Sequence, residues 1–246
     1  MNIGVDIMGG DYAPSVIVEG VVDSLENLSS DDTLVLLGDG EAIAGKLASM
    51  NISSPKLKIV PTTEVIEMGD HPAKAYSHKQ DSSIAVGFRM LKHRELDGFC
   101  SAGNTGAMLV GASYTVNVIP GVFRPALATL LPCVDGRNSI MLDVGLNTDS
   151  KPDVLLQYGI LGSIYARCVL GIPNPTVGLL NIGREETKGT AAVKAAYELM
   201  KEHPGLSFAG NIEGHSLFHE YRADVVVCDG FIGNIVLKQA EATYML

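Results

Sequence analysis

The chain has 246 residues, of which 46% are hydrophobic, so it is long enough for one large or two modest globular domains. Its 18 basic and 28 acidic residues give a net charge of −10, which argues against nucleic acid and anionic membranes as general partners. No stretch reaches the roughly 18 apolar residues of a membrane-spanning helix, and the first residues do not read as a signal peptide. Four scattered cysteines without metal-ligand spacing fit a reducing cytoplasm and predict no metal site.

Short apolar runs alternate with amphipathic stretches from one end of the chain to the other, which predicts strands and helices in alternation. The runs are continuously apolar, as in strands that are covered on both faces. Residues 14–28 and 187–202 each place apolar side chains on one stripe and predict helices. Strands are predicted at 2–7, 33–38, 56–60, 97–102, 126–132, 139–144, 176–182, 206–210 and 224–230.

This order of elements predicts an α/β fold with a mostly parallel twisted sheet and helices on both faces. Only the turn "CVDGR" separates the runs 126–132 and 139–144, and its Asp-Gly pair predicts a hairpin, so part of the sheet should be antiparallel. A helix at 152–170 is apolar nearly all round, which favours burial either in a subunit interface or in the core.

The organisation of the chain shows no linker and no low-complexity segment, so residues 1–246 are interpreted as a single α/β catalytic unit. The final stretch "IGNIVLKQAEATYML" reads as a helix without a C-terminal cap. We therefore expect that a C-terminal part of the protein is missing from this sequence.

Four segments at predicted strand ends combine glycine with asparagine, and a helix is expected after each. Glycine lets the backbone approach a ligand closely, and a helix start offers unpaired N–H groups to an anion. Because ligands of open α/β sheets lie beyond the carboxyl ends of the strands, we predict one shared anion pocket rather than four plain turns. The nucleotide-binding glycine motifs are weak or absent. The segments are "SAGNTGA" (101–107), "NIGREETKG" (181–189), "AGNIEG" (209–214) and "DGFIGN" (229–234).

Charged residues beside these segments are either surface charges or parts of a site. Arg124 and Lys188 are the candidate cations, since a buried guanidinium or ammonium would bind a phosphate-sized anion. The acids could instead cap helices or accept bonds from backbone N–H groups; they are Asp6, Asp11, Asp143, Glu213 and Asp229. Residues 71–94 form a basic stretch, either a solvated helix face or a landing site for an acidic partner, with Lys74, Lys79, Arg89, Lys92 and Arg94.

Eight motifs occur in the order and style of the bacterial phosphate acyltransferases of the PlsX family, which the chain resembles over about residues 3–241. They are "VDIMGGDYAP", "DSSIAVGFRML", "SAGNTGA", "FRPALA", "MLDVGLN", "NIGREETKG", "AGNIEG" and "DVVVCDGFIGN". The sequence departs from the family pattern at Leu146, where alanine is usual, and at Arg184, where an acid is common. His215 and His219 match nothing that the family requires, so neither is a candidate catalytic base.

The resemblance implies a fold similar to isocitrate and isopropylmalate dehydrogenases and to phosphotransacetylases. It also implies transfer of a fatty acyl group from acyl carrier protein to inorganic phosphate, giving acyl phosphate for phospholipid synthesis. A downstream membrane glycerol-phosphate acyltransferase would consume that product. The resemblance further implies a homodimer that needs no cofactor and binds no nucleic acid, in the cytoplasm or peripherally at the inner face of the membrane.

Roles in that reaction are assigned to the loop residues as hypotheses. Ser101, Gly103, Asn104, Thr105 and Gly106 would hold phosphate, and Arg124 and Lys188 would neutralise phosphate or oxyanion charge. Asn181, Asn211 and Asn234 would donate to the carbonyl, and Asp229 would orient a cation or relay a proton. Ser101 as a covalent nucleophile is less favoured because no histidine is placed to activate it. The five basic residues between 74 and 94 would dock the acidic carrier protein.

Three other functions remain open at this level. A phosphotransacetylase would use acyl-CoA and prefer short chains. A dehydrogenase of the same fold would bind a nicotinamide cofactor and often a metal. A non-catalytic regulatory module would bind acyl carrier protein or acyl chains without forming acyl phosphate.

Overall fold

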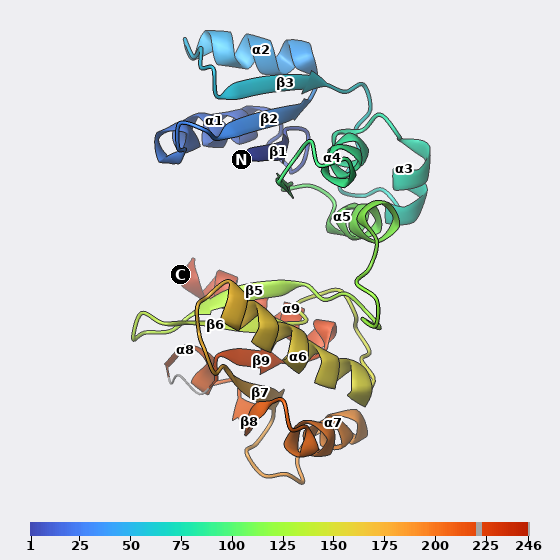
Figure 1. The fold of residues 1–246 in the computed structure, drawn as a ribbon, viewed down its shortest axis with the longest axis vertical. Helices are drawn as coiled ribbons and strands as arrows, with labels where there is room; N and C mark the ends of the chain where they lie inside the picture. The colour runs from blue at the N-terminus through green and yellow to red at the C-terminus, as the bar shows by residue number, and fades with distance from the viewer. Residues whose placement is uncertain (220–222, 246) are drawn as a thin grey trace. The chain divides into compact units, whose positions relative to one another are not determined.

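The computed structural model describes residues 1–219 and 223–245. The chain divides into two compact units, Met1–Ile119 and Pro120–Leu246, and each contains its own sheet with helices around it (Figure 1). The predicted α/β fold class is confirmed. The sequence signals no boundary because residues 116–123 read "VNVIPGVF", an apolar stretch instead of a polar linker. Whether the two units act as one catalytic unit stays a prediction.

Unit 1 contains a four-stranded parallel sheet of order β3-β2-β1-β4, so β4 is an edge strand. Its strands are β1 (Asn2–Asp6), β2 (Thr33–Gly38), β3 (Leu57–Pro61) and β4 (Gly98–Cys100). Its helices are α1 (Ser15–Ser24), η1 (Leu25–Asn27), α2 (Gly40–Ser49), α3 (Pro72–His78), α4 (Ser83–Lys92), α5 (Thr105–Gly111) and η2 (Ala112–Val116).

The strand β2 shows why this sheet is covered on both faces. Leu34 and Leu36 pack into one apolar cluster with residues of α1 and α2, whereas Val35 and Leu37 pack into another with residues of α4. Alternate side chains of a strand point to opposite faces, so a continuously apolar strand needs helices on both sides. A third cluster joins α3, α4 and α5 and includes Phe88, whose ring meets the ring of Phe99 at right angles.

Unit 2 contains a five-stranded sheet of order β5-β6-β9-β7-β8, in which only β5 runs antiparallel to its neighbour. The predicted hairpin at "CVDGR" is confirmed. Its strands are β5 (Ala128–Pro132), β6 (Asn138–Leu142), β7 (Thr176–Asn181), β8 (Ser207–Glu213) and β9 (Val225–Val227). Its helices are α6 (Pro152–Cys168), α7 (Ala191–Glu202), α8 (Ser216–His219) and α9 (Gly230–Tyr244).

Helices cover both faces of the unit 2 sheet. On one face α6 and α7 pack on alternate residues of β6, β7 and β9, and Tyr158 and Met200 are fully buried there. On the other face α8 and α9 pack on the remaining strand residues. The helix predicted at 152–170 therefore buries one face in the core of its unit, while Ile164 and Val169 stay exposed. Whether a second subunit covers that exposed face stays a prediction.

Each of the nine predicted strands corresponds to an observed strand. One segment differs from expectation: "AGNIEG" is not a turn after a strand, because β8 continues through it to Glu213. A bulge near Gly178 and a positive φ of 86° at Gly210 let the strand bend and keep pairing with β7. No helix in the described part of the chain is long and apolar enough to cross a bilayer.

Candidate functional site

The carboxyl edge of the unit 2 sheet collects most of the predicted site residues. The parallel strands β6, β9, β7 and β8 all end at this edge, and β5 begins there because it runs the other way. In the register, Asn181 lies opposite Glu213, and Ala128 lies opposite Leu142. Three of the four predicted segments and the segment before β5 therefore share one edge. The segment 101–107 belongs to unit 1, where it follows β4.

Asp143, immediately after β6, is the centre of this edge. Its side chain is fully buried, and its carboxylate Oδ1 accepts hydrogen bonds from the N–H groups of Leu127 (3.0 Å) and Leu146 (3.2 Å). Its Oδ2 accepts from the N–H group (2.7 Å) and the side-chain amide (2.9 Å) of Asn147. A buried carboxylate needs such donors to replace water. Asp143 thus ties the lead-in to β5 to the loop after β6, and the backbone-binding interpretation of this acid is confirmed.

The start of α9 packs against the same loop through two glycines. The N–H group of Gly230 donates to the carbonyl of Asn147 at 2.8 Å, and a Cβ at Gly230 would lie 2.9 Å from Asp143 Oδ2. A Cβ at Gly233 would overlap the Asp143 carbonyl oxygen. Only glycine allows this approach.

Two predicted site residues lie at the start of α9. Asp229 is the N-cap, and its carboxylate accepts from the N–H group of Ile232 at 2.8 Å. The half-buried Asn234 lies against Gly145, whose φ is 135° and whose missing Cβ would contact the Asn234 amide. At least one function of Asp229 is therefore to start the helix that positions Asn234.

The loop after β7 is held by two asparagine side chains. Asn181 Nδ2 donates to the carbonyl of Lys188 at 3.1 Å, and Asn181 Oδ1 accepts from the N–H group of Ile182 at 2.8 Å. From β8, Asn211 Nδ2 donates to the carbonyl of Glu185 at 2.9 Å. The Oδ1 atom of Asn211 is buried without a hydrogen-bond partner among the described residues. Asn181 and Asn211 therefore shape the loop that carries Lys188.

The two candidate cations are exposed. The guanidinium of Arg124 and the ammonium of Lys188 form no hydrogen bond or ion pair with any described residue of the chain. Arg184, in contrast, lies 3.3 Å from Glu213. Nearby, burial raises the pKa of Tyr158 to about 12, and burial also raises the pKa of the Cys228 thiol. Neither group is therefore ionised at neutral pH, and both act as packing groups below the edge.

The predicted phosphate loop of unit 1 is closed by a buried acid. Asp6, at the end of β1, accepts from the Ser101 hydroxyl at 2.6 Å and from the N–H group of Met8 at 3.0 Å. The Ser101 oxygen in turn accepts from the N–H group of Gly103 at 2.9 Å. A Cβ at Gly9 would lie 2.6 Å from the Gly103 nitrogen, so the loops after β1 and β4 touch through their backbones.

The rest of this loop starts the helix α5. Asn104 is its N-cap and accepts from the N–H group of Ala107 at 3.0 Å. The Asn104 amide also donates to three carbonyls of the segment 67–70. Thr105 is exposed, while a Cβ at Gly106 would overlap Pro72. Asn104 thus joins two loops, and Thr105 is the residue of the predicted set with a solvent-facing position.

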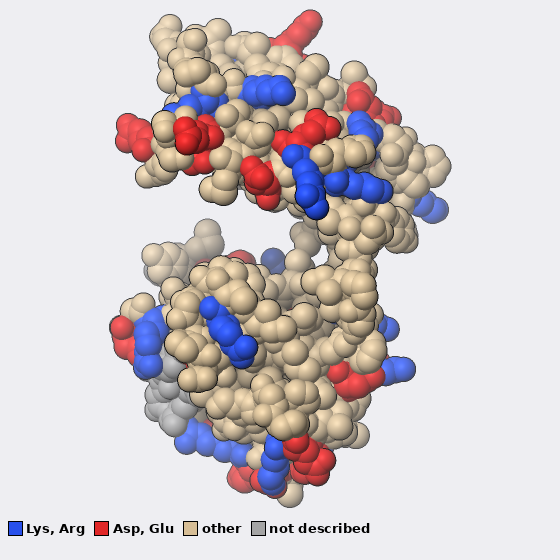
Figure 2. Space-filling view, in the orientation of Figure 1, with Lys and Arg blue, Asp and Glu red and all other residues tan. Residues whose placement is uncertain are grey.

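The basic stretch is spread over α3, α4 and the residues around them. Figure 2 shows Lys and Arg side chains gathered there, with acidic side chains beside them. Lys79 is engaged within the unit, because its ammonium binds Asp70 at 2.6 Å and the carbonyl of Val65 at 2.7 Å. Arg89 is exposed and donates to the carbonyl of Gln80 at 3.3 Å. The remaining basic residues are exposed, namely Lys74, Lys92 and Arg94.

Comparison with known proteins fits these motifs. The model of the family described as "Fatty acid synthesis protein" matches residues 1–246. A phosphate acyltransferase of Desulfitobacterium hafniense is 47% identical over 241 residues, which cover 98% of this chain and 71% of that protein. The chain belongs to the fatty acid synthesis protein family. A further member, the phosphate acyltransferase of Leuconostoc citreum, is 47% identical over 248 residues, covering 100% of this chain and 70% of that protein.

Solved structures of similar fold include two phosphotransacetylases. The Streptococcus pyogenes protein has a TM-score of 0.70 at 16% identity and covers 100% of this chain and 82% of its own. The EutD protein of Staphylococcus aureus has the same TM-score and identity, with coverage of 99% and 82%. At this identity the likeness shows the fold alone.

The roles of Asp6 and Asp143 were only partly predictable. Asp6 ends β1 and Asp143 directly follows β6, and their positions beside predicted loops marked them as possible binders of backbone N–H groups. The sequence did not reveal that Asp143 binds a segment as far away as Leu127, because that contact depends on the β5–β6 pairing. The family membership supports a functional interpretation of the glycine-containing loops but assigns no role to single residues.

Proposed function

We propose that this protein transfers a fatty acyl group from the thioester of acyl carrier protein to inorganic phosphate. As a member of a family whose relatives are phosphate acyltransferases, the protein is an acyltransferase of fatty acid and phospholipid synthesis. The finer proposal concerns the donor, the partners and the residues. The single observation that carries it is the 47% identity with phosphate acyltransferases over nearly the whole chain.

The reaction forms one bond and breaks one. An oxygen of phosphate attacks the thioester carbonyl carbon, which gives a tetrahedral oxyanion. The carbon–sulfur bond then breaks, the thiolate leaves and takes up a proton, and acyl phosphate remains. Phosphate is already anionic at neutral pH, so the protein mainly has to hold it, orient it and stabilise developing charge.

The unit 2 edge supplies groups of the required kind. Arg124 and Lys188 carry positive charge that no described residue neutralises, so both are available to an anion. Asn234 and the backbone N–H groups at the start of α9 can donate to an oxyanion. Unit 1 offers a separate candidate anion site on its own loop, where Thr105 is exposed while Ser101 and Asn104 keep the loop in shape.

The test of the reaction is acyl hydroxamate formation. Dodecanoyl carrier protein is incubated with the protein, phosphate and hydroxylamine, and a reaction without phosphate is the control. We expect hydroxamate only when phosphate is present. A parallel reaction with butyryl-CoA tests the phosphotransacetylase alternative, which would use a short-chain CoA thioester. Faster turnover of the CoA thioester, or no hydroxamate from either donor, would contradict the proposal.

The test of the cations is Lys188→Ala and Arg124→Ala, with phosphate varied at saturating acyl donor. Loss of one charge-assisted contact should lower kcat/KM for phosphate about tenfold to hundredfold. Lys194→Ala is the matched control, because Lys194 is an exposed lysine on the outer part of α7. Unchanged phosphate dependence in both variants would remove these residues from the site.

The partners and the location are part of the same proposal. The donor would be an acidic carrier protein that docks on the exposed basic residues of α3 and α4. The acyl phosphate would pass to a membrane glycerol-phosphate acyltransferase. We further propose a homodimer that lies in the cytoplasm or peripherally at the inner face of the membrane.

A further inference from the structure

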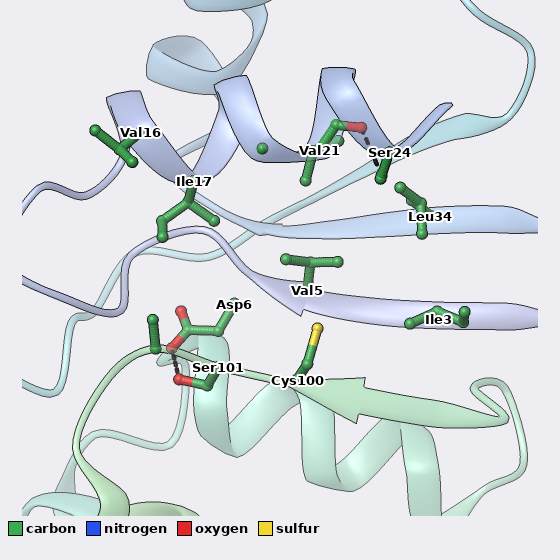
Figure 3. Close-up of a pocket in the computed structure, with 12 residues that line it drawn as sticks. Ile3, Val5, Asp6, Val16, Ile17, Val21, Ser24, Leu34, Cys100 and Ser101 are labelled. Carbon is green, nitrogen blue, oxygen red and sulfur yellow. Dashed lines mark hydrogen bonds between the residues drawn. The ribbon is translucent and has the colours of Figure 1, made fainter. Parts of the chain in front are cut away.

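Asn211 of β8 holds a buried polar atom that the core does not need. Its side chain is 8% exposed, and its Oδ1 atom has no hydrogen-bond partner among the described residues. At the edge of unit 1, by contrast, the Ser101 hydroxyl and the Asp6 carboxylate satisfy each other at 2.6 Å (Figure 3). An apolar residue at position 211 would leave no acceptor unpaired, as with Leu179 opposite it on β7. A polar group kept against this cost points to a functional role.

The side-chain amide of Asn211 binds the turn that carries Lys188. Asn211 Nδ2 donates to the Glu185 carbonyl at 2.9 Å, and the Lys188 N–H group donates to the same carbonyl at 3.1 Å. At the other end of the turn, the Lys188 carbonyl accepts from Asn181 Nδ2 of β7 at 3.1 Å. Two asparagine side chains from neighbouring strands therefore fasten both ends of the turn 185–188 to the sheet.

Further contacts restrict the Lys188 side chain itself. Within the turn, Glu186 accepts from the Tyr197 hydroxyl at 3.1 Å and binds the Lys201 ammonium at 2.8 Å, both on α7. Gly183 is buried, and a Cβ there would lie 3.1 Å from Lys188 Cγ. The aliphatic part of the Lys188 side chain therefore packs on the backbone of Gly183, while its ammonium is exposed without a partner among the described residues. These contacts limit the positions that the ammonium can take.

We propose that Asn211 and Gly183 are positioning residues, which fix the place of the Lys188 ammonium and do not contact the substrate. The inference rests on the proposed function, in which Lys188 neutralises the charge of phosphate or of the oxyanion. The sequence alone suggested that Asn211 donates to the thioester carbonyl, but its amide is buried and bonded to Glu185. A cation that stabilises developing charge has to be held in place, because a shift of about 1 Å can cost about a hundredfold in rate.

Asn211→Leu separates a role in stability from a role in the reaction, because leucine has nearly the shape of asparagine and no polar side-chain atom. It removes the unpaired oxygen, and the Glu185 carbonyl keeps its bond from the Lys188 N–H group. We therefore expect the unfolding midpoint in urea to be no lower than in the wild type. The value of kcat/KM for phosphate should nevertheless fall about tenfold, because the turn loses its anchor on β8. No fall would overturn the proposal.

The double variant with Lys188→Ala distinguishes positioning from direct catalysis. If Asn211 acts through Lys188, Asn211→Leu should lower kcat/KM for phosphate less than about twofold once the lysine is gone. Losses that multiply would overturn the proposal, because Asn211 would then act on the substrate or on the fold by itself. Asn174→Leu is the matched control, since Asn174 is exposed before β7 at the opposite edge of the sheet, and it should change neither value.

Two further variants keep the test decisive if Asn211→Leu does not fold. Asn211→Ser is smaller than asparagine and too short to reach the Glu185 carbonyl, and its effect should also depend on Lys188. Gly183→Ala displaces the Lys188 side chain from the other side, since the added Cβ would also lie 2.7 Å from Glu185 Oε2. We expect a fall of about twofold to fivefold that disappears in the Lys188→Ala background. Equal losses with and without Lys188 would overturn the proposal.

The same assays keep this inference apart from the proposed function. All rates are measured as hydroxamate formed from dodecanoyl carrier protein with phosphate varied. Wild-type protein that forms no hydroxamate would contradict the proposed function itself. Wild-type activity with an unchanged phosphate dependence in Lys188→Ala would leave the function standing and would overturn the positioning roles of Asn211 and Gly183.

Discussion

Asp143 holds the loops of the unit 2 edge in place, although it has no proposed part in the reaction itself. Four donors surround its buried carboxylate, and they come from the segment before β5 and from the loop after β6. The start of α9 approaches the same carboxylate through Gly230. Arg124, Asp229 and Asn234 all lie on segments that meet here. Asp143 is therefore a positioning residue for the unit 2 edge.

Asp143→Asn should destabilise the protein. The amide group would present its own N–H donors to N–H groups that now meet an acceptor, and a buried donor without a partner costs about 1–3 kcal/mol. We expect the free energy of unfolding, measured in urea, to fall by about 2–5 kcal/mol. Asp149→Asn is the control, because Asp149 is an exposed residue of the same loop. A variant as stable as the wild type would show that the carboxylate does not hold the loop.

Residues of this kind mark the limit of prediction from sequence. The glycine-rich segments and the acids beside them were recognisable as loops of a site, since glycine and aspartate after an apolar strand favour turns and close backbone approach. The hydrogen-bond partner of the buried Asp143 could not be predicted from the sequence. Leu127 lies 16 positions before Asp143, and only the hairpin brings the two residues together. Lys79 was predicted to face a partner, yet Asp70 and Val65 already bind its ammonium.

At the scale of elements, the segment before α3 supports the predicted phosphate loop of unit 1. The Asn104 amide binds three carbonyls between Glu67 and Asp70, and Asn104 also caps α5. The hydrogen bond from the Lys79 ammonium is the main reason that the pKa of the Asp70 carboxylate lies below its ordinary value. The N–H group of Glu67 lowers this pKa further. The ionised form of Asp70 therefore stabilises this segment in the folded state.

This arrangement predicts an acid-sensitive segment. Because the pKa of Asp70 is lower in the folded than in the unfolded protein, its stabilisation is present above the unfolded pKa and is lost as the pH falls through the folded pKa. We expect Asp70→Asn to speed hydrogen exchange of the Glu67 and Ala107 amides at neutral pH. The difference from the wild type should vanish in acid.

The control for this experiment lies in the other unit. Asp135→Asn removes another carboxylate whose pKa is lowered, in the β5–β6 hairpin, where Arg137 pairs with Asp135. It should leave exchange at Glu67 and Ala107 unchanged. Equal exchange in the wild type and Asp70→Asn at neutral pH would show that the Asn104 bonds alone hold the segment.

Strands were the most predictable elements of this protein, because nine apolar runs of the right length could hardly be anything else. The end of β8 was missed since its sequence, "AGNIEG", has the composition of a turn. Gly210 takes a left-handed conformation inside the strand, and the pairing with β7 outweighs the local preference. The unit boundary at 119–120 was missed for a related reason, since its residues are apolar.

At the scale of the whole molecule, the net charge of −10 opposes the approach of an acidic carrier protein. Docking therefore needs a local positive surface, and the exposed Arg89 and Lys92 on α4 offer one. Charge complementarity of this kind acts mainly on the rate of association and weakens with salt.

Reversing these charges gives the corresponding prediction. We expect Arg89→Glu with Lys92→Glu to raise KM for the carrier-bound donor about tenfold at low salt, with little effect near 1 M salt. Turnover of a small thioester, such as a dodecanoyl pantetheine, should not change. Lys194→Glu with Lys238→Glu is the control, because it alters the net charge by the same amount on exposed residues of unit 2. An equal effect of both double variants would mean that only overall charge matters.

The reversed direction of β5 has a consequence for how the unit 2 edge is built. Arg124 precedes the strand β5, whereas Asn181 ends β7 and Asp229 follows β9. The hairpin turn 133–137 sets the register of β5 and therefore the position of the Arg124 guanidinium. A shift of one residue in the pairing of the two hairpin strands would move Arg124 about 3.3 Å along the strand direction, toward or away from the edge, and would turn alternate side chains to the wrong face. The position of Arg124 thus depends on a turn at the opposite end of the sheet, away from the proposed site.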